Sequence, residues 1–127
     1  MDICFLIASS AKKSYQKLSE TYAAIEPPTW ALLLAQSCRS KGFKVSIIDA
    51  NVENLSNEKV LEKISNLNPR ILCLVVYGQN VNAGTANMRG ATDITNFLKE
   101  NKISCPIAFI GSHVQALPVE TLKKEKN

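Results

Sequence analysis

The feature that most constrains this chain is an apolar run that is followed at once by a polar segment. The run, residues 71–76, is short, continuous and half β-branched. Such a run is typical of a strand that is buried on both faces of a parallel sheet. Residues 77–91 then carry three Asn, one Gln, one Tyr and three Gly. Ligands of open α/β sheets bind outside the carboxyl ends of the strands, so this segment is predicted to be a ligand-binding loop. A solvated loop, in which Asn and Gly serve only turn geometry, explains the same residues equally well.

Length and charge favour one ordinary globular domain, which we expect to span residues 1–127. A chain of 127 residues buries roughly two thirds of its unfolded surface, which is enough for a core. The net charge of +4 is mild, and the lysines near both ends are not interleaved with aromatic residues. We therefore interpret them as solvated surface and expect no nucleic-acid partner.

The cysteines and the N-terminus indicate the compartment. Cys4, Cys38, Cys73 and Cys105 stand far apart, and no two of them have the spacing of metal ligands. They are predicted to be small core residues in a reducing environment. The N-terminus lacks the basic segment of a signal peptide, and no apolar run approaches the roughly 20 residues that span a bilayer. We expect a cytoplasmic protein without a membrane partner.

Apolar and amphipathic segments alternate along the chain. Strands are predicted at residues 3–8, 43–49, 71–76 and 105–110. Helices are predicted at residues 30–41, between Ser56 and Pro69, at residues 92–100, and from Pro118 onward. Residues 9–28 form a long connection, of the kind that is usually functional, with a helical turn predicted around residues 15–22. The β-α-β-α-β-α-β-α order predicts a parallel sheet with helices on both faces and right-handed crossovers.

Several side chains are assigned to helix ends and helix faces. Thr29 and Ser56 are predicted N-caps, and Gly42 is expected just past the end of the first helix. The buried faces of the four helices are expected to include the following residues: Trp30, Leu33, Leu34 and Cys38; Val60, Leu61, Ile64 and Leu67; Ile94, Phe97 and Leu98; and Leu122.

Common catalytic and nucleotide-binding motifs do not occur. No Gly-x-Gly-x-x-Gly or P-loop follows the first predicted strand, and no acidic pair stands there to hold Mg²⁺. Asp49 is therefore predicted to be a turn residue. His113 is the only histidine, so it completes neither a hydrolytic triad nor a metal site. It is either a loop residue that bonds the backbone or a ligand contact. We predict no catalytic residue and no metal ligand, and expect a site that binds rather than reacts.

Three segments, in this order and spacing, resemble the N-terminal cobalamin (B12)-binding domain of B12-dependent radical SAM enzymes. The first comprises residues 27–36, Pro-Pro-Thr-Trp-Ala-Leu-Leu-Leu-Ala-Gln, with residues 41–50, Lys-Gly-Phe-Lys-Val-Ser-Ile-Ile-Asp-Ala. The second is Asn68-Pro69-Arg70-Ile71, which leads into the third predicted strand. The third, residues 109–120, is similar to the family's Gly-Gly-Pro-His…Pro-Glu segment, with one Ser in place of its second Gly and Pro.

The resemblance implies a flavodoxin-like, doubly wound α/β fold in three layers. The strand order would be 2-1-3-4, with the family's fifth strand missing because the chain stops near Asn127. A corrinoid would lie across the carboxyl ends of the strands, and its nucleotide tail would enter the domain. Small and polar residues there would let the macrocycle approach the backbone. The implied cofactor-binding residues are Ser9, Ser10, Tyr77, Gly78, Gln79, Asn80, Gly111, Ser112 and His113.

Two departures from the family pattern refine what the resemblance implies. No Asp-x-His-x-x-Gly follows the first predicted strand, so the cobalamin is expected to be base-off without a histidine from the protein. No Cys-x-x-x-Cys-x-x-Cys occurs, so no iron–sulfur cluster is expected in this chain, which would be part of a radical SAM methyltransferase or its partner. The edge strand 105–110 would invite homodimerisation. Two alternatives stay open: a degenerate docking module that binds no cofactor, and a binder of flavin or a nucleotide.

Overall fold

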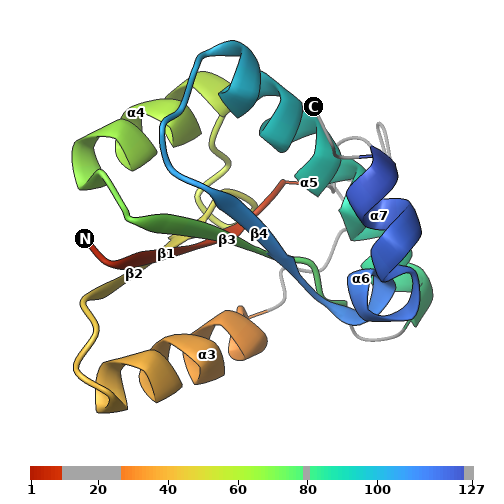
Figure 1. Cartoon of the computed structure of the whole chain (residues 1–127), viewed down its shortest axis with the longest axis horizontal. Helices are drawn as coiled ribbons and strands as arrows, with labels where there is room; N and C mark the ends of the chain where they lie inside the picture. Colours follow the sequence, from red (N-terminus) through yellow and green to blue (C-terminus); the bar gives the residue numbers. More distant parts are fainter. Residues whose placement is uncertain (10–26, 79–80, 125–127) are drawn as a thin grey trace.

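Four parallel strands form the centre of the molecule. The computed structural model describes residues 1–9, 27–78 and 81–124, except for the side chains of residues 81 and 82. The strands are β1 (Ile3–Ile7), β2 (Val45–Asp49), β3 (Ile71–Val75) and β4 (Ile107–Ile110), in the order β2-β1-β3-β4 (Figure 1). In the register of the sheet, Leu6 of β1 lies between Ile48 of β2 and Leu74 of β3. The predicted order 2-1-3-4 is confirmed, although β2 and β4 each begin two residues later than expected.

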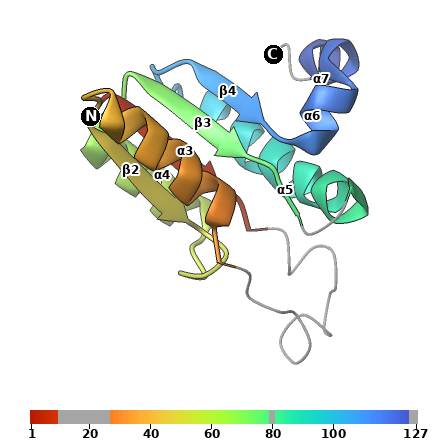
Figure 2. The same ribbon diagram turned by 90° about the horizontal axis from the view of Figure 1, so that it is seen from below.

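Helices cover both faces of the sheet, which gives the expected three layers. Helix α3 (Thr29–Ser40) packs on one face, against β1 and β2 (Figures 1 and 2). Helices α4 (Asn57–Leu67) and α5 (Val81–Glu100) pack on the other. Two short helices, α6 (Ser112–Ala116) and α7 (Pro118–Lys124), follow β4. The helical turn expected around residues 15–22 lies outside the described residues.

The core consists of two clusters, one on each side of the sheet. Alternate residues of β3 point to opposite faces, so Leu72 and Leu74 join the cluster under α4 and α5, while Cys73 and Val75 join the cluster under α3. All four side chains are buried, which confirms the prediction that this strand is covered on both faces.

Local sequence explains most helix boundaries. The Ser56 hydroxyl accepts a hydrogen bond of 3.4 Å from Lys59 N, which confirms it as the N-cap of α4. Gly42 follows the C-cap of α3 at a φ of +89°, a conformation that favours glycine. The N-cap prediction for Thr29 is wrong: Pro28 is the N-cap, and Thr29 is the first helical residue.

The largest correction concerns α5, which begins at Val81 rather than at residue 92. Most of the predicted ligand loop is therefore helix. Its Asn and Gly residues are weak helix formers, but Gly84, Met88, Gly90 and Ala91 are all buried. The small residues let this helix approach its neighbours closely, and packing outweighs local preference.

The C-terminal helices also differ from expectation. The sequence predicts a loop after the last strand, whereas residues Ser112–Ala116 form helix α6. Helix α7 begins at Pro118, as expected. Its inner residue is Thr121, which is buried, whereas Leu122 is 69% exposed. The prediction that Leu122 lies on the inner face of this helix is therefore wrong, and the neighbouring residue lies there instead.

Candidate functional site

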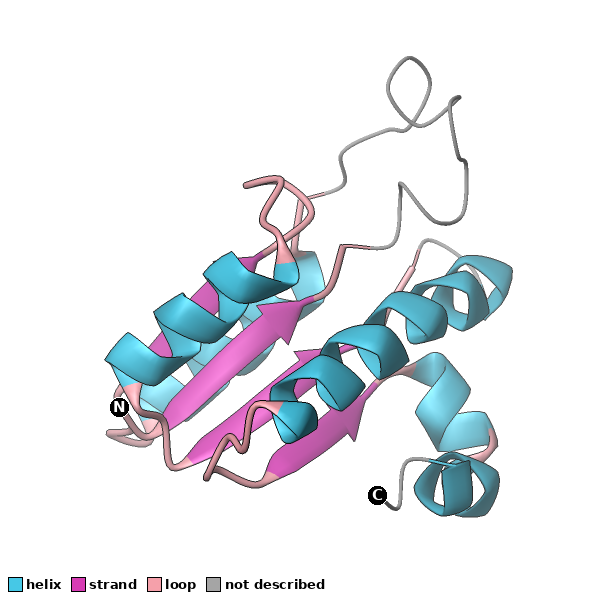
Figure 3. Cartoon of the chain, turned by 90° about the horizontal axis from the view of Figure 1, so that it is seen from above, coloured by secondary structure: helices cyan, strands magenta, loops and turns pink. Residues whose placement is uncertain are grey.

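All four strands end at the same edge of the sheet, where most of the predicted site residues gather (Figure 3). Ser9 follows β1, Tyr77 and Gly78 follow β3, and a group of three follows β4: Gly111, Ser112 and His113. The predicted residues Ser10, Gln79 and Asn80 lie outside the described part of the chain. We call this set of described residues the carboxyl-edge site.

The ends of β3 and β4 are joined backbone to backbone. Val76 N donates a hydrogen bond of 2.7 Å to Ile110 O. Gly111 is buried against Val76, and a Cβ at position 111 would lie 2.7 Å from the carbonyl carbon of Val76. Since real side chains do not approach that closely, only glycine fits here. Gly111 thus fixes the distance between the two strand ends, a role that the sequence alone did not show.

The chain after β3 is held by the start of α5. Asn87 Nδ2 donates a hydrogen bond of 2.9 Å to the carbonyl of Tyr77. A Cβ on Gly78 would lie 2.5 Å from Ala83 Cβ and 2.8 Å from Gly84 N. Residues of the helix that was expected to be loop therefore position two of the predicted ligand contacts.

Ser112 and His113 lie at the start of α6 and face α5. A Cβ on Gly84 would lie 2.6 Å from Ser112 Oγ, so this hydroxyl sits directly beside α5. The His113 Nδ1 and Thr85 Oγ1 atoms are 3.2 Å apart, at hydrogen-bond distance. His113 is half-buried. The sequence left open that His113 bonds the backbone. The partner of its ring in this contact is instead the Thr85 side chain.

An aromatic pair borders the carboxyl-edge site. Trp30, in the first turn of α3, stacks on Tyr77 with ring centroids 4.7 Å apart and an interplanar angle of 21°. The helical spacing predicts Trp30 only on the inner face of its helix, yet it is 51% exposed. The sequence did contain a signal for this placement near the site. Trp30 follows Pro27 and Pro28 at the start of a crossover helix, and such a helix begins beside the carboxyl ends of the strands.

Other polar and thiol groups have structural roles. Asp49 Oδ1 accepts hydrogen bonds from Asn51 N and Val52 N, at 3.1 and 3.0 Å, which confirms it as a turn residue. Cys4 and Cys73 are buried. Burial, with the nearby thiols of Cys105 and Cys73, raises the pKa of Cys4 to about 12. This thiol is therefore protonated at neutral pH, in agreement with its predicted role in the core.

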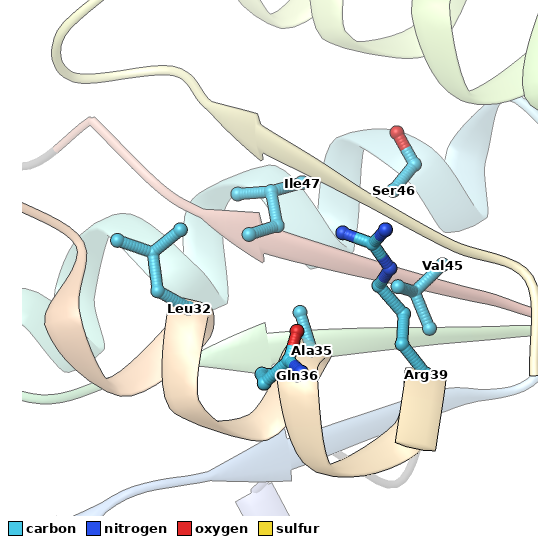
Figure 4. Close-up of a pocket in the computed structure, with 7 residues that line it drawn as sticks. All are labelled: Leu32, Ala35, Gln36, Arg39, Val45, Ser46 and Ile47. Atoms are coloured by element: carbon cyan, nitrogen blue, oxygen red, sulfur yellow. The ribbon is translucent and has the colours of Figure 1, made fainter. Parts of the chain in front are cut away.

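Two hollows lie away from the carboxyl-edge site. One, of about 390 Å³, lies between α3 and β2, where the side chain of Arg39 extends from α3 toward the strand beside Val45 (Figure 4). The other, of about 520 Å³, lies between β4, α5 and α7 and includes Thr95 and Thr121. Neither contains a predicted site residue. Within residues 1–9, 27–78 and 81–124, no group of three His, Cys, Asp or Glu is placed to hold a metal, and no helix is long and apolar enough to cross a membrane.

A family model described as the B12 binding domain matches residues 15–127. The chain belongs to the B12-binding domain family. Searches of curated proteins and of solved structures gave no match. Membership confirms the flavodoxin-like fold and indicates cobalamin as the ligand of this B12-binding domain.

The carboxyl-edge site fits such a cofactor. Gly78 and Gly111 add no side chain of their own at the ends of β3 and β4, where they pack against Ala83 and Val76, and the small Ser9 follows β1. The serine hydroxyls and the backbone N–H groups are suitable partners for the amide side chains of a corrinoid. The aromatic pair adds a flat apolar surface beside them.

Proposed function

We propose that this B12-binding domain holds cobalamin across the carboxyl ends of β1, β3 and β4. The observation that carries the proposal is the joint between Val76 and Gly111, which brings the β3 and β4 ends together with no side chain between them. The proposed contacts are Ser9, Tyr77, Gly78, Gly111, Ser112 and His113. Ser10, Gln79 and Asn80 are proposed as further contacts from their places in the sequence.

Five of the six described contacts have a specific task in this proposal. Ser9 and Ser112 hydrogen-bond the amide side chains of the corrinoid. Gly78 and Gly111 allow the close packing at the ends of β3 and β4 that shapes the floor of the site. The contact with Thr85 orients the imidazole of His113, so this side chain meets the cofactor in a fixed position. When bound, cobalamin supplies methyl transfer or assists a radical step.

The proposed binding mode is base-off without a histidine from the protein on cobalt. Residues 9–13 are Ser-Ser-Ala-Lys-Lys, so the segment after β1 offers no imidazole. The single histidine is on α6, where it contacts Thr85. Electron paramagnetic resonance of the Co(II) form tests this mode: a base-off spectrum without nitrogen hyperfine splitting is expected, and nitrogen splitting would contradict it.

The proposed setting is a cytoplasmic radical SAM methyltransferase, whose iron–sulfur chemistry is supplied outside these residues. This setting rests on the sequence resemblance. The outer edge of β4 has no strand partner among the described residues, so we also propose that it pairs with a second copy. Light scattering after size-exclusion chromatography tests this pairing: a dimer mass is expected, and a monomer mass at every protein concentration would contradict it.

A titration with hydroxocobalamin and methylcobalamin tests the central proposal. We expect a change in visible absorption together with a melting temperature that rises with ligand concentration. His113→Ala should weaken binding. Lys59→Ala, on α4 and exposed, is the matched control and should bind as wild type does. A folded protein with neither signal would contradict cobalamin binding and favour the docking module.

A further inference from the structure

Trp30 is a large aromatic side chain placed in an unusual position. It belongs to α3, whose Ala31 and Ala35 are buried against the sheet, but half of its own surface faces solvent. One side of its ring stacks on Tyr77, a residue of the carboxyl-edge site. The exposed remainder is therefore an apolar surface at the rim of that site.

Hydrogen bonds hold the backbone on which each of the two stacked rings is carried. Asn87 fixes the backbone of Tyr77 from α5. Trp30 lies in a regular helical turn, in which Leu32 N donates a hydrogen bond of 2.9 Å to Pro28 O. A ligand that meets a surface fixed in this way loses less free energy to ordering of side chains.

The chemistry of the surface limits what it can bind. Stacked aromatic rings favour flat conjugated partners through dispersion and quadrupole interactions. The chain continues with small residues at the ends of β1 and β3, where Ser9 and Gly78 lie. A flat cofactor that lies over the ends of β1 and β3 has this pair as its side wall.

We propose that Trp30 is a cobalamin contact, with the exposed part of its indole packed against a flat conjugated part of the cofactor and Tyr77 as its support. This inference rests on the proposed function, which does not itself involve Trp30. Two parts of cobalamin share the required chemistry, the corrin ring and the base of the nucleotide tail.

Binding constants of matched variants test the contact. Trp30→Leu removes the ring and should weaken binding about tenfold, the cost of roughly 1.4 kcal/mol. Trp30→Phe keeps an aromatic ring and should restore most of the affinity. Phe43→Leu is the control, because Phe43 is 48% exposed but precedes β2, at the opposite end of the sheet. It should bind as wild type does.

Cobinamide, which lacks the nucleotide, distinguishes the two parts of the cofactor. If Trp30→Leu weakens binding of cobinamide and cobalamin equally, Trp30 contacts the corrin ring. If it weakens only cobalamin, the contact is to the base. Wild-type affinity of Trp30→Leu for both ligands would overturn the contact. Absence of binding to the wild-type chain is a different result, since it contradicts the proposed function itself.

A measurement on the unaltered sequence tests the contact even if a variant fails to fold. Trp30 is the only tryptophan, so labelling with 5-fluorotryptophan gives one ¹⁹F resonance. Diamagnetic Co(III) cobalamin should shift this resonance in step with the visible absorption change. A resonance that stays in place while absorption reports saturation would overturn the contact.

Discussion

The side chain of Asn87 donates a hydrogen bond to the backbone carbonyl of Tyr77, and this bond connects the end of β3 to α5. Tyr77 in turn stacks on Trp30 of α3. Elements from both faces of the sheet therefore meet at one residue. This arrangement makes Tyr77 the point at which the stability of the fold and the shape of the carboxyl-edge site depend on each other.

Asn87→Ala should lower the free energy of unfolding by about 1 kcal/mol, the usual cost of one lost hydrogen bond. Urea denaturation measures the change. Asn96→Ala is the control, because Asn96 is exposed on the same helix and should change stability by less than about 0.5 kcal/mol. Equal effects of the two substitutions would show that the bond to Tyr77 contributes nothing specific.

Gly111→Ala should destabilise the protein by about 3 kcal/mol or more, because the added methyl group overlaps the backbone of Val76. Gly42→Ala separates this overlap from backbone strain: a Cβ at position 42 would meet no atom within 4 Å, but the φ of Gly42 is +89°. Its expected cost is about 1 kcal/mol. Thermal melts of both variants measure the difference, and a Gly111→Ala protein as stable as wild type would refute the close contact.

Thr95→Val should leave stability unchanged or raise it by about 1 kcal/mol. Thr95 is fully buried, and its hydroxyl has no hydrogen-bond partner among the described residues. Valine has nearly the same shape without the buried polar atom. Thr85→Val is the contrasting variant, since it removes the contact with His113 and should be mildly destabilising. A large loss of stability in Thr95→Val would reveal a partner for this hydroxyl.

Stability should fall as the pH rises above about 9. Burial raises the pKa of Cys4 to about 12 from an ordinary value of 9.0, so between these values the unfolded chain has lost a proton that the folded chain retains. The folded state then binds more protons, and the free energy of unfolding decreases by up to about 1.4 kcal/mol per pH unit. Below pH 9 the contribution is constant.

The variant Cys4→Ala isolates this effect from the titration of lysine and tyrosine. Its stability should be lower at pH 7 because a buried side chain is shortened, but its decline between pH 9 and pH 11 should be shallower than that of wild type. Parallel declines would show that the pKa of Cys4 is not raised in the folded protein.

The sheet was predictable because its strands carry the signal in their own residues. Apolar runs such as Ile71–Val75 reveal strands buried on both faces, and the alternation with amphipathic segments predicts parallel pairing. Caps such as Ser56 act within one turn and are visible in sequence. The start of α5 was missed because burial of Gly84 and Met88 depends on tertiary packing, which local preference does not report.

The carboxyl-edge site was only partly predictable for a related reason. The position of a residue after a strand identifies its edge, so Tyr77 and His113 could be assigned there. The stack with Trp30 depends on the relative placement of α3 and β3, which are far apart in the sequence. Likewise, the requirement for glycine at position 111 comes from the backbone of Val76 and not from neighbours in sequence.

The joint between Val76 and Gly111 also limits how this domain can diversify. It is made by backbone atoms, so substitutions at position 76 that keep the strand leave it intact, whereas position 111 accepts one residue. Variants that keep this joint therefore keep the shape of the floor of the site. In the proposed binding mode, adjustment to a corrinoid of different size would use the wall on α3, where a change at position 30 alters the opening without moving a strand.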